Sequence, residues 1–429
     1  MALREVVTTD AGRMATLAFL EALFDGAGAE ELAVRLWDGS QWRPRNARGE
    51  PRVTLVLNHP GTLRNMFSAP SDLVLGEAYI YDDCDVEGDI ECLFRVIDGL
   101  FARGFSVGEK LRYAALLSGL PKSSAPRGER QARLNGALHS RTRDRSAVRF
   151  HYDLSNDFYR LWLDRRMVYS CAWFGSERDT LDQVQENKLE YICRKLRLRK
   201  GERLLDIGCG WGALIVHAAK RYGARALGIT LSGQQAELAN QRIHEEGVED
   251  RCRAEVRDYR DLEGETFDKI VSIGMVEHVG EKMLGEYFRR AWAAVCAGGV
   301  FLNHGIAQVF HKPNRGESFV QRYVFPDSEL VPFSSMTTAA EDAGWEVRDV
   351  ENLREHYVMT LRHWVRRLER QAAAARKLAD EVTYRIYRLY MAGAAHRFRT
   401  GQLSVHQTLL VKPDAGESHL PLSRADWYG

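Results

Sequence analysis

Residues 204–213 read Leu204-Leu-Asp-Ile-Gly-Cys-Gly-Trp-Gly-Ala213, an apolar run followed by glycines at alternate positions. The apolar run predicts a buried strand. The glycines allow a tight turn, and they let a ligand come close to the N-terminus of the next helix. Asp206 stands just before the turn, where its carboxylate can orient the turn or face a ligand's ammonium group.

The ligand of this turn is not identified by the glycines alone, because NAD sites share the pattern. The next strand ends in Thr230-Leu-Ser, whereas an NAD site would carry an acidic residue there to hold a ribose. This difference favours S-adenosylmethionine over NAD. A glycine turn that binds nothing is the plain structural alternative.

Strand-like and helix-like segments alternate around the turn, which predicts an α/β fold with a parallel, doubly wound, Rossmann-like sheet. The expected strands are residues 203–207, 224–230, 253–258, 269–274, 299–304, 346–350 and 404–411. The expected helices between them are residues 212–221, 233–246 and 279–294. Insertions near residues 308–343 and 353–400, the second a long helix, are expected to cover a substrate.

Three regions follow from this pattern. Residues 1–121 mix short strands and helices and are expected to form a small α+β module. Residues 122–149 carry eight Lys/Arg against two acids and are expected to be a linker. The linker is either a solvated boundary or a basic surface for anionic lipid. Residues 150–429 then form the cofactor-binding domain.

Composition excludes several classes of protein. The chain has 429 residues and a formal charge of +1, so global charge favours no anionic partner. Its apolar runs are far shorter than the roughly 20 residues of a membrane span. The N-terminus lacks the apolar core of a signal peptide. The seven cysteines show no C-x-x-C spacing, which disfavours a disulfide framework or a zinc site and suits a reducing cytosol. Nucleic acid is not expected as a partner, because no recognition pattern accompanies the basic segment.

A set of motifs between about residues 145 and 412 resembles the cyclopropane-fatty-acyl-phospholipid synthase family. That family includes the mycolic-acid cyclopropane synthases and is related to fatty-acid 10-methylene methyltransferases. The motifs, in order, are Phe150-His-Tyr-Asp-Leu-Ser, Met167-Val-Tyr-Ser-Cys-Ala-Trp-Phe, the turn at 206–212, Gly228-Ile-Thr-Leu-Ser, Gly274-Met-Val-Glu-His-Val-Gly and Phe301-Leu-Asn-His-Gly-Ile. The N-terminal module resembles that of the longer, phospholipid-acting members through Gly76-Glu-Ala-Tyr and Asp85-Val-Glu-Gly-Asp.

The resemblance implies a class I S-adenosylmethionine-dependent methyltransferase domain that adds a carbon to the cis double bond of unsaturated phospholipid acyl chains. The family's reaction passes through a carbocation on the chain, and a bound bicarbonate ion removes the proton that closes a cyclopropane ring. The implied cofactor-binding residues are Tyr169, Ser170, Asp206, Gly208, Gly210, Trp211, Thr230, Ser232, Gln235 and Tyr259. The implied catalytic residues, which would surround the bicarbonate, are Glu277, His304, Tyr357, Cys171 and Ile306.

The implied roles differ among these catalytic residues. Glu277 accepts a hydrogen bond from the anion, His304 balances its charge, and Tyr357 donates its hydroxyl. Cys171 and Ile306 act mainly through their backbone amides. A nucleophilic Cys171 is disfavoured, because an alkene offers a thiolate nothing to attack.

The sequence departs from the family at two positions. Ala394 replaces a cysteine that is common in the mycolic-acid branch, so no role of that cysteine applies here. Arg260 replaces an acid, which puts a contact with the adenine amine in question.

Alternatives stay open at this stage. The same methyl transfer followed by a hydride shift gives a 10-methylene chain, the precursor of a methyl branch. A small-molecule methyltransferase and a non-catalytic lipid-binding protein are the other classes. We expect a cytoplasmic protein, peripheral to the inner face of the membrane, and self-association into a homo-oligomer is open.

Overall fold

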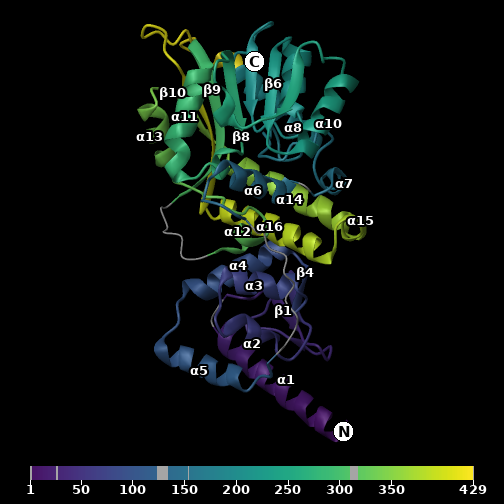
Figure 1. Ribbon diagram of the computed structural model, residues 1–429. Helices are drawn as coiled ribbons and strands as arrows, with labels where there is room; N and C mark the ends of the chain where they lie inside the picture. The colour runs from purple at the N-terminus through teal and green to yellow at the C-terminus, as the bar shows by residue number, and fades with distance from the viewer. Residues whose placement is uncertain (1, 26–27, 123–133, 153, 310–316, 429) are drawn as a thin grey trace. The chain divides into compact units, whose positions relative to one another are not determined.

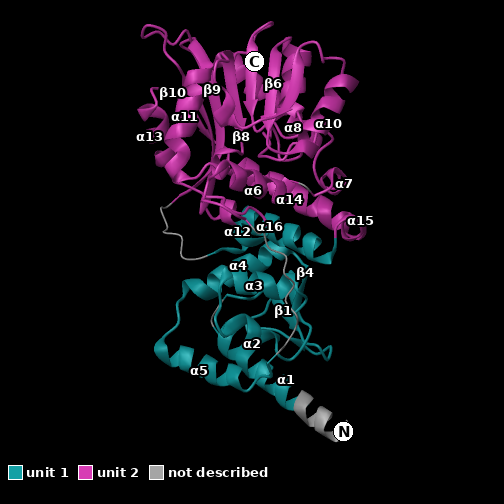
Figure 2. Cartoon of the chain, in the orientation of Figure 1, with its two compact units in different colours: residues 1–131, 316–323, 380–396 teal, residues 132–315, 324–379, 397–429 magenta. Residues whose placement is uncertain are grey.

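Two compact units make up the chain in this computed structural model, which describes residues 2–25, 28–122, 134–152, 154–309 and 317–428 (Figure 2). Unit 1 comprises residues 1–131, 316–323 and 380–396. Unit 2 comprises residues 132–315, 324–379 and 397–429. Two short segments from the second half of the sequence therefore belong to the unit that contains the N-terminal region.

The sheet of unit 2 has seven strands in the order β10-β11-β9-β8-β5-β6-β7 (Figure 1). The strands are β5 Arg203–Ile207, β6 Arg225–Thr230, β7 Cys252–Val256, β8 Phe267–Ile273, β9 Val295–Gln308, β10 Glu346–Asn352 and β11 Leu403–Val411. Each overlaps one of the strands expected from the sequence, and β5 to β9 run parallel. The α/β fold prediction is confirmed.

Strand β11 differs from the expected parallel arrangement, because it runs antiparallel to both β9 and β10. The chain leaves β10 and returns to β11 at the same edge of the sheet, where Asn352 pairs with His406. A strand that starts where its neighbour ended has to run back in the opposite direction.

Helices cover both faces of this sheet (Figure 1). Helices α8 (Leu181–Lys195), α9 (Ala213–His217) and α10 (Gly233–Glu245) share a buried cluster with Leu204. Helices α11 (Leu284–Ala294) and α13 (Phe333–Asp342) share the opposite cluster with Leu205. Successive side chains of a strand point to opposite faces, so β5 contributes to both cores.

The second insertion consists of several helices and not of the one long helix that the sequence predicts. Residues 353–400 form three helices, α14 (Arg354–Arg370), α15 (Ala372–Leu378) and α16 (Glu381–Arg399). Asp380 starts the last of them, because its carboxylate accepts the backbone amide of Thr383 at 2.6 Å. In the other insertion, residues 310–316 lie outside the described residues.

The expected linker contains regular structure. Its residues 123–133 lie outside the described residues, whereas Arg141–Tyr152 forms helix α6. Arg143 in this helix pairs with Asp327, and Arg141 pairs with Asp261. These two arginines thus serve contacts within unit 2.

Unit 1 holds a four-stranded sheet in the order β2-β1-β3-β4. Its strands are β1 Leu32–Arg35, β2 Gln41–Trp42, β3 Val53–Leu57 and β4 Cys84–Gly88. Its helices are α1 Ala2–Phe24, α2 Thr62–Phe67, α3 Asp72–Ile80, α4 Ile90–Ala102, α5 Val107–Ser118 and α12 Phe319–Tyr323, with most of α16. The mixture of short strands and helices expected for this module is present.

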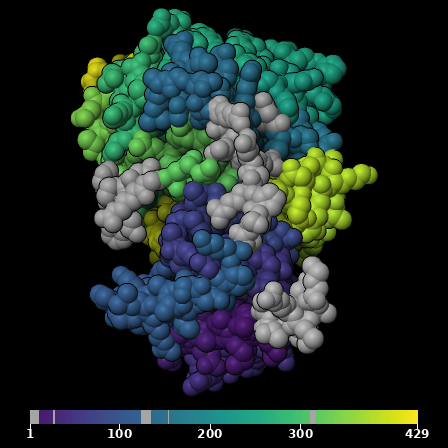
Figure 3. Space-filling view, turned by 60° about the horizontal axis from the view of Figure 1, so that its bottom comes forward, coloured from purple at the N-terminus to yellow at the C-terminus, as the bar shows by residue number. Residues whose placement is uncertain are grey.

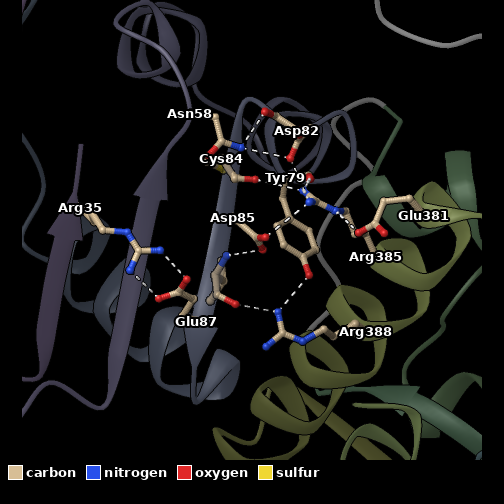
Figure 4. Close-up of polar contacts among 11 residues, drawn as sticks. Arg35, Asn58, Tyr79, Asp82, Cys84, Asp85, Glu87, Glu381, Arg385 and Arg388 are labelled. Carbon is tan, nitrogen blue, oxygen red and sulfur yellow. Dashed lines mark hydrogen bonds and ion pairs between the residues drawn. The ribbon is translucent and has the colours of Figure 1, made fainter. Parts of the chain in front are cut away.

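Helix α16 is bonded into unit 1 by two buried arginines (Figure 4). Arg385 donates to the carbonyl oxygens of Tyr79 and Cys84, at 2.8 and 3.2 Å. Arg388 donates to the Tyr79 hydroxyl and to the carbonyl oxygen of Val86. Helix α16 is therefore hydrogen-bonded to α3 and β4 of unit 1, although it lies about 300 residues away from them in sequence.

The surface of unit 1 includes an apolar stripe on α5, which is coloured blue in Figure 3. Val107 and Leu111 lie one helical turn apart, and both are exposed. Lys110 and Arg112 flank them and are also exposed. None of the helices in the described part of the chain is long and apolar enough to cross a membrane.

Candidate active site

A cavity in unit 2 lies at the carboxyl ends of β5, β6 and β8, the edge where open α/β sheets bind ligands. It is also lined by α6, by residues 167–170 and by part of α8. The residues expected to bind the cofactor that line it are Tyr169, Ser170, Asp206, Gly208, Gly210, Trp211, Thr230, Gln235 and Tyr259.

The glycine turn has the backbone that the sequence predicts. Gly208 and Gly212 have φ angles of +85° and +81°, in the region that favours glycine. Gly228 on β6 supports the turn from below, since a Cβ there would lie 2.7 Å from the Sγ atom of Cys209. The backbone can approach a ligand at this edge because no side chain intervenes.

Asp206 is buried under the turn. Its Oδ1 atom has no hydrogen-bond partner among the described residues. Burial raises the pKa of this carboxyl to about 7, and the charge of Lys188 opposes that rise. A buried carboxylate oxygen without a partner indicates a place for a ligand donor such as an ammonium group.

Ser232 lies outside the cavity lining and has a structural contact. It begins α10, where its hydroxyl accepts the backbone amide of Gln235 at 3.4 Å. The Gln235 side chain in turn accepts a hydrogen bond from the Thr230 hydroxyl at 2.6 Å. Ser232 thus positions Gln235 and, through it, the end of β6.

Arg260, the departure from the family pattern, is held by carboxylates beside Tyr259. Its guanidinium donates to Asp258 and to Asp144, a residue of α6, at 2.6 and 3.0 Å. These charge-assisted bonds raise the pKa of Arg260. Its guanidinium also lies 5.3 Å from the ring centre of Tyr259. The arginine therefore ties α6 to the edge of the cavity.

An aromatic wall adjoins the cavity at Tyr169. The ring of Tyr169 lies 5.1 Å from Trp162 and 5.2 Å from Trp364, both fully buried. His151 stacks on Tyr169 at 5.6 Å, and burial lowers its pKa well below the usual value. The rings on this side of the site are therefore buried, and the His151 imidazole is neutral.

Glu277 sits in a short 3-10 helix, Val276–His278, directly after β8. Its neighbours Met275 and His278 line the cavity, whereas Glu277 itself is 7% exposed behind them. Its Oε1 atom accepts the backbone amide of Ile306 at 2.7 Å. Its Oε2 atom has no partner among the described residues. Burial raises the pKa of this carboxyl to about 7.

His304 is buried on β9, two residues before Ile306. Its Nδ1 atom lies 3.2 Å from the Nε2 atom of Gln407, and its Nε2 atom has no partner in the part of the chain that the structure describes. Burial lowers the pKa of His304 well below its usual value. The imidazole is therefore neutral in the chain without a ligand, and its role beside a bound anion stays a prediction.

Cys171 and Tyr357 meet at the start of α14. The Cys171 thiol points to the carbonyl oxygen of Leu353 at 3.7 Å, and the Tyr357 amide donates to the same oxygen at 3.0 Å. Leu353 in turn donates to Val405, which pairs with Ile306 across the sheet. Burial raises the pKa of the Cys171 thiol, so it stays protonated.

The five expected catalytic residues thus belong to one neighbourhood, although none of them is among the described residues that line the cavity. Ile306 differs from its expected role, because its amide already donates to Glu277.

The cavity is also lined by residues that the sequence did not point to, among them Lys188, Met275 and His278. Burial lowers the pKa of His278 to about 4, so it is neutral. Lys188 had a visible signal, because it lies on the apolar face of α8 with Leu181, Val184 and Ile192. A lysine on the apolar face of a helix is expected to be buried, and a buried lysine usually has a charged or polar partner or a ligand.

Comparison with known proteins identifies the family to which the chain belongs. Residues 139–408 match the model for mycolic acid cyclopropane synthetase. The chain belongs to this family. A separate model, described as a domain of unknown function, matches residues 19–100 in unit 1.

Relatives of the family match most of the chain. A probable fatty acid methyltransferase of Pseudomonas putida is 42% identical over 92% of this chain and 96% of its own length. The probable fatty acid methyltransferase Rv3720 of Mycobacterium tuberculosis is 35% identical over 96% of this chain and 98% of its own. The chain is an S-adenosylmethionine-dependent methyltransferase of the cyclopropane and fatty acid methyltransferase family.

A solved structure of the same family is also similar to this chain. It is mycolic acid cyclopropane synthase CmaA1 complexed with SAH and CTAB, 33% identical, with a TM-score of 0.59. The match covers 62% of this chain and 97% of that chain.

Proposed function

We propose that this methyltransferase adds a carbon to the cis double bond of unsaturated acyl chains of phospholipids and gives a cyclopropane fatty acid. The observation that carries the proposal is the position of Glu277, a buried carboxyl directly behind the wall of the cofactor cavity, with one oxygen left without a described partner. The names of the relatives that match nearly the whole chain support a fatty acyl substrate.

The cavity fits S-adenosylmethionine. The glycine turn leaves room for a backbone approach, and the buried Oδ1 atom of Asp206 suits an ammonium group. When bound, the cofactor supplies an electrophilic methyl group. Gln235 and Thr230 would hold its ribose, and Tyr259 would lie against its adenine. Tyr169 and Trp211 would form the wall beside the methyl group.

The aromatic wall protects the acyl chain once the new carbon has been added. Alkylation of an alkene leaves a carbocation, which water would capture. Tyr169 lines the cavity and would present its π face to the cation, while Trp162 and Trp364 pack against its ring and would keep water from that side. A dry site of this kind suits an olefin better than an oxygen or nitrogen nucleophile, which needs a polar pocket and a base.

A bicarbonate ion would serve as the base that removes the proton, held by Glu277, His304 and Tyr357. Two carboxyl-type groups side by side repel each other when both are ionised. The pKa of about 7 at Glu277 removes this difficulty, because a protonated Glu277 can donate to the anion. A neutral His304 can donate from Nε2 in one tautomer, and Ile306 fixes Glu277 in place.

A 10-methylene product is the second candidate. It uses the same cofactor, alkene and base, and it differs only in a hydride shift before proton loss. The relatives matched over nearly their whole length are named fatty acid methyltransferases, a name that keeps this product open beside the ring.

Product analysis tests both. The purified chain is incubated with methyl-labelled S-adenosylmethionine and vesicles of oleoyl phospholipid, and the released fatty acids are identified by mass spectrometry. A labelled ring or a labelled methylene on the acyl chain supports the proposal and selects the product. Absence of label from the lipid, together with binding of S-adenosylhomocysteine, would show that another substrate is used.

The lipid substrate requires contact with a membrane, and we propose that this contact is peripheral, reversible and on the cytoplasmic side. The exposed Val107 and Leu111 on α5, flanked by Lys110 and Arg112, suit insertion at an anionic surface. The basic segment 122–149 would add charge. Co-sedimentation with vesicles is expected to need anionic lipid and to fall with salt. Equal binding to neutral vesicles at high salt would contradict this mode of contact.

A further inference from the structure

Lys188 is a buried cation at the cofactor cavity. It lies on α8, is 1% exposed, and lines the cavity. Its Nζ atom donates to the Ser170 hydroxyl at 2.8 Å. An ammonium group inside a protein is costly unless an opposite charge or several acceptors compensate it. A hydroxyl is a weak compensation for a full charge.

The other cationic side chains of the cavity already have partners. Arg260 is bonded to Asp258 and Asp144. Arg257 is bonded to Glu265 and to the carbonyl oxygen of Asp261. Among the described residues that line the cavity, Lys188 is the one lysine or arginine without a carboxylate at ion-pair distance. It is therefore the cation with capacity for a ligand.

Two acidic side chains lie near Lys188, Asp164 and Asp206. The first is already hydrogen-bonded to backbone amides, and the second has an oxygen without a described partner. Asp164 is buried, and its carboxylate accepts the backbone amides of Arg166 and Val168. Asp206 lies close enough to Lys188 for their charges to interact, and its Oδ1 atom has no described partner. One cation and one anion with free capacity thus face the same cavity.

This pair matches the charges of an α-amino acid, which carries a carboxylate and an ammonium group. We propose that Lys188 recognises the carboxylate of the cofactor's amino-acid tail, together with the Ser170 hydroxyl that it holds, while Asp206 faces the ammonium group. The inference rests on the proposed cofactor site and is independent of the bicarbonate and of the lipid product. It assigns Lys188 to cofactor recognition, a residue outside every motif that marked the site.

Calorimetry with two ligands tests the assignment. S-adenosylhomocysteine carries both charged groups, whereas its decarboxylated analogue keeps the ammonium group alone. In Lys188→Met, affinity for S-adenosylhomocysteine is expected to fall about 10- to 100-fold, the range for a lost charged hydrogen bond. Affinity for the decarboxylated analogue is expected to change by less than about threefold.

The matched control is Lys195→Met. Lys195 is on the same helix and equally buried, but it pairs with Glu351 and Asp349 and is absent from the described cavity lining. This variant is expected to lower thermal stability and leave both affinities within about threefold. Lys188→Gln, which keeps the length and can still bond to Ser170, serves if Lys188→Met folds poorly. Calorimetry separates the binding-competent fraction from the affinity, so a partly folded preparation still reports.

The outcomes separate cleanly. Equal weakening of both ligands would mean that Lys188 only holds the segment around Ser170, and the proposal would be wrong. Unchanged affinity for S-adenosylhomocysteine would also overturn it. If the wild-type chain fails to bind S-adenosylhomocysteine at all, the proposed cofactor site is itself wrong, and the failure is seen before any variant is made.

Discussion

Glu277 and Ile306 are joined by a hydrogen bond of 2.7 Å, in which the backbone amide of Ile306 donates to Oε1 of Glu277. The bond connects the short helix that follows β8 to the carboxyl end of the neighbouring strand β9. It holds one carboxyl oxygen in place and leaves the other directed into a buried space without a described partner. This arrangement can present a carboxyl group to a small anion.

Glu277→Gln is expected to abolish most of the turnover without affecting the cofactor. The amide can still accept from Ile306, but it cannot ionise, so it no longer reproduces the hydrogen bonds that the carboxyl group would make with the bicarbonate. Because the bicarbonate is the proposed base, turnover with oleoyl phospholipid vesicles is expected to fall about 10²- to 10⁴-fold, the usual range for loss of general base catalysis. Calorimetric affinity for S-adenosylhomocysteine is expected to stay within about threefold. Unchanged turnover would show that Glu277 does not hold the base.

The pH dependence of stability gives a second prediction. Burial raises the pKa of Glu277 and of Asp206 to about 7, so the folded chain keeps protons that the unfolded chain has lost. This stability is therefore fully present below the unfolded pKa values, 4.5 for Glu277 and 3.8 for Asp206, and is lost as pH rises through about 7. Each group contributes up to roughly 3–4 kcal/mol to that loss.

Denaturant unfolding at pH 5 and pH 8 measures this effect. Glu277→Gln is expected to reduce the loss of stability between the two pH values. Glu237→Gln, on the exposed side of α10, is the matched control and is expected to leave the difference as in the wild type. The same pH profile in all three chains would show that Glu277 does not take up a proton on folding.

The support beneath the glycine turn gives a third prediction. A Cβ at Gly228 would lie 2.7 Å from Cys209 and 2.8 Å from Ile215, so Gly228→Ala has to displace the turn. We expect a loss of about 1–3 kcal/mol in stability and weaker binding of S-adenosylhomocysteine. Gly233→Ala is the control, since a Cβ there meets nothing within 4 Å. Thermal melting and calorimetry compare the two, and equal behaviour would mean that the turn tolerates a shift.

The sequence predicts the strands and the glycine turn well, because both depend on local pattern. The apolar runs of β5 and β8 are buried on both faces, and Gly208 needs its positive φ whatever surrounds it. The role of Ile306 could not be predicted in this way. Its amide bonds to Glu277 because a particular turn after β8 brings the carboxylate to it, and no local pattern records that turn.

Lys188 and α16 show the same limit at longer range. The position of Lys188 on an apolar face signals a buried charge, but its contact with Ser170 depends on how residues 167–171 fold against α8. The unit to which α16 belongs depends on bonds between Arg385 and Tyr79, which are 306 residues apart. Hydrophobic periodicity identifies the helix and carries no information about its distant partner.

Arg385 provides the last prediction, because unit 1 contains its own control (Figure 4). The Arg385 guanidinium is buried and bonds to the carbonyl oxygens of Tyr79 and Cys84 and to the side chains of Asp82 and Glu381. Arg385→Leu would remove the charged donor that the buried carbonyl oxygens of Tyr79 and Cys84 share. Loss of these charge-assisted hydrogen bonds is expected to reduce the stability of unit 1 by about 2–4 kcal/mol.

Arg35→Leu is the matched change in the same unit, on strand β1. Arg35 is joined to Glu87 by two hydrogen bonds, but both side chains are substantially exposed, at 33% and 54%. An exposed ion pair contributes about 0–1 kcal/mol, so this variant is expected to unfold close to the wild type. Denaturant unfolding followed by the proteolytic susceptibility of residues 28–122 measures both variants. If α16 is a structural part of unit 1, Arg385→Leu lowers the free energy of unfolding far more than Arg35→Leu does. Equal losses of stability in the two variants would contradict this assignment.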